Sequence, residues 1–76
     1  MAAILNALKA LVSKIPFHKV PQFLAWAANL AKAAASKTAA EVTKILNFIK
    51  SNGGKIVDWF SKGYTVYEII RMILGY

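Results

Sequence analysis

Few side chains in this chain of 76 residues could carry acid–base or metal chemistry. Its acidic residues are Glu41, Asp58 and Glu68, its single histidine is His18, and it has no cysteine. Both glutamates stand three residues after a threonine, the spacing at which a carboxylate caps the start of a helix. Because acid–base catalysis and metal binding need such groups in pairs or clusters, we expect no enzyme, no metal site and no cofactor.

Positive charge, in contrast, runs through the whole sequence. The formal net charge is +7, and residues 1–40 contain no acid. Lysine carries a compact, hydrated charge that suits diffuse attraction to a charged surface, whereas arginine is preferred for bidentate recognition. Since nine of the ten cations are lysine, the composition favours an anionic surface over nucleic acid. The ten basic residues are Lys9, Lys14, Lys19, Lys32, Lys37, Lys44, Lys50, Lys55, Lys62 and Arg71.

The chain is also 58% apolar, which is high for a soluble protein of this charge. Trp26, Trp59, Phe60 and Tyr64 could be core residues of a small bundle, or rings that settle among lipid headgroups. The sequence leaves both roles open. An anionic bilayer suits both the positive charge and the high apolar content, because lysine ammonium groups can contact lipid phosphate while apolar helix faces contact acyl chains. We therefore expect the ten basic residues and these four aromatic residues to bind a membrane.

Helices must position these side chains, since apolar residues recur at helical spacing and no alternating segment is present. Pro16 should end the first helix at Ile15, and Pro21 suits the first turn of the second. Asn52-Gly53-Gly54 is expected to stop the third helix, with a glycine in the left-handed conformation, and Gly63 the fourth. The predicted helices cover residues 1–15, 21–35, 38–51, 55–62 and 65–74.

Two helix starts carry the reciprocal capping-box spacing, Thr38 with Glu41 and Thr65 with Glu68. The fold class predicted is all-α, a compact bundle of five short amphipathic helices forming one domain over residues 1–76. A chain of this size rarely gains more than about 3–5 kcal/mol from its core. Four or five lysines near an anionic bilayer, at about 1 kcal/mol each, would rival that stability. We therefore expect a bilayer to compete with the core and open the bundle.

Residues 54–75, GKIVDWFSKGYTVYEIIRMILG, carry a family resemblance. Gly54-Lys55, an aliphatic pair, Asp58-Trp59 and a turn at Gly63 precede a final amphipathic helix. This order resembles the C-terminal part of the leaderless bacteriocins related to aureocin and lacticin Q. The start, Met1-Ala2-Ala3 followed by a lysine-bearing helix, is similar to that family as well.

The resemblance implies a saposin-like fold and a secreted antimicrobial peptide made without a cleaved leader. It would permeabilise the anionic cytoplasmic membrane of competing, mainly Gram-positive bacteria, and self-association on the membrane is left open. This chain is longer than the family members and adds the insert from Pro16 to Pro21. The circular bacteriocins are a more distant relation, so head-to-tail joining of Met1 and Tyr76 is also left open.

Two other functions fit the same composition. A small basic helical module that binds nucleic acid or protein would need its lysines and aromatic residues on one face. A cytolytic toxin would act on membranes with little preference for bacteria. The longest uncharged segment, residues 20–31, is too short to span a bilayer, which needs roughly 20 residues.

Overall fold

A computed structural model describes residues 2–75 and confirms the all-α class with five α-helices. No strand occurs among these residues, and two short 3₁₀ turns, η1 (Val12–Lys14) and η2 (Phe17–Lys19), lie between the first two helices. Met1 and Tyr76, which head-to-tail joining would involve, lie outside the described residues. The helices are α1 (Ala2–Lys9), α2 (Val20–Ala34), α3 (Ala39–Ser51), α4 (Gly53–Ser61) and α5 (Val66–Leu74).

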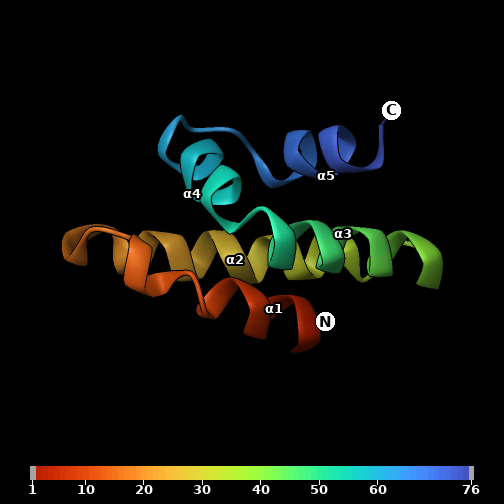
Figure 1. Ribbon diagram of the computed structural model, residues 1–76, viewed down its shortest axis with the longest axis horizontal. Coiled ribbons are helices and arrows are strands. Elements are labelled where there is room, and N and C mark those ends of the chain that lie inside the picture. Colours follow the sequence, from red (N-terminus) through yellow and green to blue (C-terminus); the bar gives the residue numbers. More distant parts are fainter. Residues whose placement is uncertain (1, 76) are drawn as a thin grey trace.

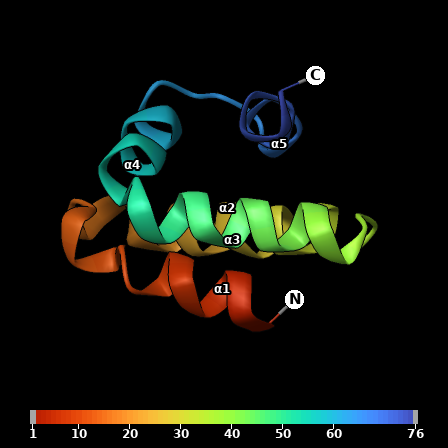
Figure 2. The same ribbon diagram turned by 45° about the vertical axis from the view of Figure 1, so that its right-hand side comes forward.

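The helices form layers in a bundle whose principal extents are 34 × 22 × 20 Å. The two longest helices, α2 and α3, run in opposite directions through the middle of the view (Figure 1), and α1 and α5 each pack against both of them. α1 packs on one side of this pair, while α4 and α5 lie on the other (Figures 1 and 2). Within residues 2–75, none of the helices has both the length and the hydropathy to cross a membrane.

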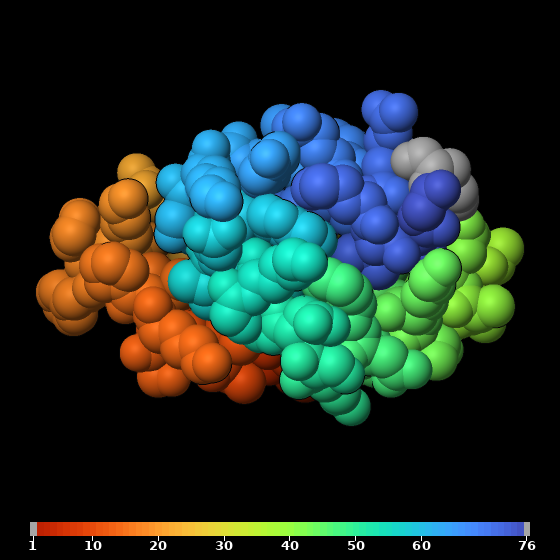
Figure 3. Space-filling model, turned by 45° about the horizontal axis from the view of Figure 1, so that its top comes forward, coloured from red at the N-terminus to blue at the C-terminus, as the bar shows by residue number. Residues whose placement is uncertain are grey.

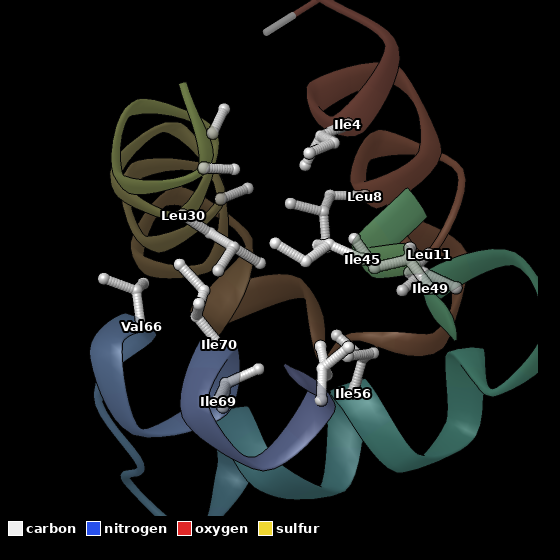
Figure 4. Close-up of a cluster of buried hydrophobic side chains, with 14 of the residues drawn as sticks. Ile4, Leu8, Leu11, Leu30, Ile45, Ile49, Ile56, Val66, Ile69 and Ile70 are labelled. Carbon is white, nitrogen blue, oxygen red and sulfur yellow. The ribbon is translucent and has the colours of Figure 1, made fainter. Parts of the chain in front are cut away.

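The core between the layers is entirely hydrophobic. Ile4 and Leu8 of α1, Leu30 of α2, Ile45 of α3 and Ile69 of α5 are fully buried and point into one cluster (Figure 4). No polar or charged side chain is buried among the described residues. The core is thus held by apolar contacts, mostly between aliphatic side chains, with Phe23 as its largest fully buried member.

The first helix is shorter than predicted, and it ends at Lys9 instead of Ile15. Ile15 is extended, with φ −100° and ψ 135°, as the steric demand of Pro16 requires. The intervening chain tightens into η1, where Lys14 N–H donates to the Leu11 carbonyl at 2.9 Å. This tighter path keeps Leu11 and Ile15 buried. The apolar spacing therefore predicts these buried residues correctly, but the segment that carries them is not α-helical.

The predicted stop at residues 52–54 is also wrong in part. Asn52 alone interrupts the helices, and Gly53 already begins α4. Neither Gly53 nor Gly54 has a positive φ. Gly53 serves close packing, because a Cβ there would lie 2.6 Å from Leu11 Cδ2.

Left-handed glycines instead follow α4 and α5, where Gly63 has φ +86° and Gly75 has φ +85°. Gly63→Ala should lower the free energy of unfolding by about 1–2 kcal/mol, because a Cβ is strained in that conformation. Gly54→Ala is the matched control, since Gly54 is helical and has open space around its Cα. Gly54→Ala should raise stability by about 0.4–1 kcal/mol. Urea unfolding measures both, and a shift of the two variants in the same direction would contradict this assignment.

Both predicted capping boxes are confirmed. In the first, Thr38 Oγ1 accepts from Glu41 N–H at 3.2 Å, and Glu41 Oε1 accepts from Thr38 N–H at 3.1 Å. In the second, the equivalent distances between Thr65 and Glu68 are 3.2 and 3.0 Å. The Thr65 N–H holds the pKa of Glu68 below its usual range. The starts of α3 and α5 are therefore each fixed by two residues three positions apart.

Candidate functional site

The ten cations lie on all five helices and on the connectors between them. Three of them, Lys32, Lys37 and Arg71, line one cavity between α2 and α5. Lys62 pairs with Asp58 at 3.0 Å, and this carboxylate raises the pKa of Lys62. The remaining cations do not line that cavity; they are Lys9 on α1, Lys14 on η1, Lys19 on η2, Lys44 and Lys50 on α3, and Lys55 on α4.

Two of the predicted aromatic residues, Trp26 and Phe60, come together around Phe23, which is fully buried. The rings of Phe23, Trp26 and Phe60 form an aromatic cluster, with centroid distances of 5.8, 5.1 and 5.4 Å. Trp26 Nε1 also donates a hydrogen bond to the Tyr64 carbonyl at 3.2 Å. The aromatic cluster therefore ties α2 to α4 and to the segment before α5.

Trp59 belongs to a separate group. Its ring stacks on Phe48, with centroids 5.4 Å apart and planes within 4° of parallel. The Lys55 ammonium lies 5.8 Å from the Trp59 ring centroid on the same helix, a cation–π geometry. In the closed bundle, both tryptophans are thus half-buried and engaged with other rings. Of the two roles left open for them, the structure shows packing.

Sequence reasoning missed the most exposed large apolar side chain among the described residues. Phe17 is 93% exposed and begins η2, directly after Pro16. We call residues 16–21 the proline turn; it projects at one end of the molecule (orange in Figure 3). Lys19 N–H donates to the Pro16 carbonyl at 2.8 Å, which holds the turn in shape. The signal that could have revealed Phe17 is a large ring between two prolines, where no helix face can bury it.

Other large apolar side chains are exposed on α5 and on the segment just before it. Tyr67 is 69% and Met72 43% exposed on α5, and Tyr64 is 37% exposed just before that helix. Tyr64 and Met72 line a second cavity together with Glu68 and Arg71. The exposed surface therefore carries cations and large apolar groups next to each other.

The cations on this surface can attract anions, and its exposed rings can become buried in an apolar medium. No cluster of three or more His, Cys, Asp or Glu side chains that could hold a metal ion occurs within residues 2–75. Ammonium and guanidinium groups can instead bind anionic oxygens, and exposed rings can enter an apolar medium. Comparisons with protein families, curated proteins and solved structures find nothing that matches this chain.

Proposed function

We propose that the protein is a secreted antimicrobial peptide, a bacteriocin, that permeabilises the anionic cytoplasmic membrane of competing, mainly Gram-positive bacteria. The supporting observation is a surface on which cations from every helix accompany exposed large apolar side chains such as Phe17 and Tyr67. Such a surface can gain from lipid phosphate and from acyl chains at once.

Binding would begin with the cations. Each basic residue close to an anionic bilayer contributes about 1 kcal/mol, so four or five on one side suffice for capture. Exposed rings then enter the headgroup layer. Phe17 can do so without any change in the fold, because almost none of its surface is in contact with protein.

After the rings have entered the headgroup layer, the helix bundle would open along the boundary between its layers. The core holds no buried polar or charged side chain among the described residues, so acyl chains can replace its apolar surroundings. α4 joins α3 through Asn52 alone, which gives the layers a single-residue joint. Opening also requires the Trp26–Tyr64 hydrogen bond and the aromatic cluster to separate. The lesion we propose is lipid-lined, because short amphipathic helices lie in the interface and do not span it.

Dye release from vesicles tests this function. We expect leakage from phosphatidylglycerol vesicles at concentrations that leave phosphatidylcholine vesicles intact, because the +7 charge drives capture. Raising the salt concentration should weaken capture by screening. Negligible leakage from both lipids would contradict permeabilisation.

Two further measurements separate the alternatives. Binding to duplex DNA that falls steeply with salt, without vesicle affinity, would indicate a basic binding module. Lysis of erythrocytes at bactericidal concentrations would indicate a toxin without bacterial preference.

A further inference from the structure

A cavity of about 540 Å³ lies between the C-terminal half of α2 and one face of α5. These two helices pack together in the bundle, with α5 above that half of α2 (Figure 1). Its volume falls in the range of small-molecule sites. We call it the α2–α5 cavity; its lining includes Asn29, Lys32, Lys37, Tyr67, Ile70 and Arg71.

The α2–α5 cavity collects cations from three separate segments, since Lys32 lies on α2, Lys37 follows that helix and Arg71 lies on α5. The Arg71 guanidinium can hold two oxygens of one phosphate, and the lysines add point charges. No acidic side chain lines this cavity among the described residues. Glu68, which interacts with Arg71, lines the neighbouring cavity instead and offsets part of the charge.

The lysines near the C-terminus of α2 could have another role than anion binding, because lysine side chains at a helix end can donate to its last carbonyls. The structure assigns those carbonyls to other donors. Ala35 N–H donates to the carbonyls of residues 31 and 32 at 3.1 and 3.2 Å, and Lys37 N–H donates to that of residue 34 at 3.0 Å. Ser36 Oγ donates to the carbonyl of residue 33 at 2.9 Å. The lysine side chains are therefore not required to complete this helix end.

The remaining lining suits an anion with carbon attached. The Asn29 amide and the Tyr67 hydroxyl offer neutral donors, while Ala33 and Ile70 form an apolar wall. The cavity exceeds the size of a bare phosphate ion. A glycerophosphate group would place its phosphate among the cations and its carbons against the wall.

We propose that the α2–α5 cavity binds a phosphate ester anion. The shared chemistry is a phosphate bearing a small organic group, which either a phospholipid headgroup or a free phosphate ester supplies. Only the lipid source rests on the proposed function. Binding of a soluble phosphate ester would hold whether or not the protein permeabilises membranes.

The test is an amide NMR titration with sn-glycerol 3-phosphate and with inorganic phosphate, at constant ionic strength set by chloride. We expect saturable shifts confined to residues 29–37 and 66–72. K32Q/R71Q should weaken binding at least about tenfold, because each removed group makes a charge-assisted hydrogen bond. The control K44Q/K50Q removes the same charge from α3, outside the cavity, and should bind as the parent does.

Three outcomes would overturn the site: shifts that never saturate, shifts spread over all the cations, or equal weakening in both double variants. Binding to phosphatidylglycerol vesicles then identifies the source of the phosphate. A larger loss of vesicle affinity in K32Q/R71Q than in K44Q/K50Q supports the headgroup. Equal losses, with saturable binding in solution, support a soluble ester. Saturable binding by a protein that causes no dye release would overturn the proposed function and leave this site standing.

Discussion

Phe23→Ala should leave much of the protein unfolded in buffer at room temperature. Phe23 is fully buried and contacts the rings of both Trp26 and Phe60. Removing a buried phenylalanine side chain costs about 3–5 kcal/mol, which equals the stability expected of so small a core. Circular dichroism during urea titration should show a transition that begins without denaturant.

Phe17→Ala is the matched control, because it makes the same substitution at a side chain that is 93% exposed. Its free energy of unfolding should stay within about 0.5 kcal/mol of the parent, as for other surface changes. A Phe23→Ala variant as stable as Phe17→Ala would show that the aromatic cluster does not support the bundle.

The same Phe17→Ala variant should bind anionic vesicles at least about tenfold more weakly. Full burial of a phenylalanine side chain contributes about 1.5–3 kcal/mol, and the proline turn presents this ring without any rearrangement. Binding is measured by centrifugation with phosphatidylglycerol vesicles. Because net charge and fold are unchanged, a loss of affinity reports the ring itself.

Phe17→Leu separates insertion from a specific aromatic contact. It keeps an apolar side chain in the proline turn and should retain most of the affinity. If Phe17→Ala binds as tightly as the parent, the proline turn does not enter the bilayer, and capture depends on the cations alone.

Features set by neighbouring residues were predictable from the sequence. The Thr38 and Thr65 capping boxes form as expected because both partners lie in one turn of chain. The five helices follow from apolar spacing for the same reason. The α1 boundary was not predictable, because the core draws Leu11 and Ile15 inward along a 3₁₀ path. Helix and 3₁₀ turns share nearly the same spacing of apolar residues over so short a distance.

The candidate site likewise has features that the sequence predicts and features that depend on how the helices pack. The sequence identified Lys32, Lys37 and Arg71 as cations but could not place them around one cavity, since that depends on how α5 crosses α2. The stacking of Trp59 on Phe48 likewise depends on the angle at the α3–α4 joint. Phe17 was missed because periodicity describes the faces of longer helices, and Phe17 lies in the three-residue turn η2.

The capping boxes have a consequence for spectroscopy. Each is closed by its own four-residue segment, so separating the layers removes none of its hydrogen bonds. The asymmetric surroundings of the indole rings, by contrast, come from distant parts of the chain. Far-ultraviolet ellipticity should then persist when the protein binds lipid, while the near-ultraviolet bands collapse. The helices would keep their secondary structure and change only the side chains against which they pack.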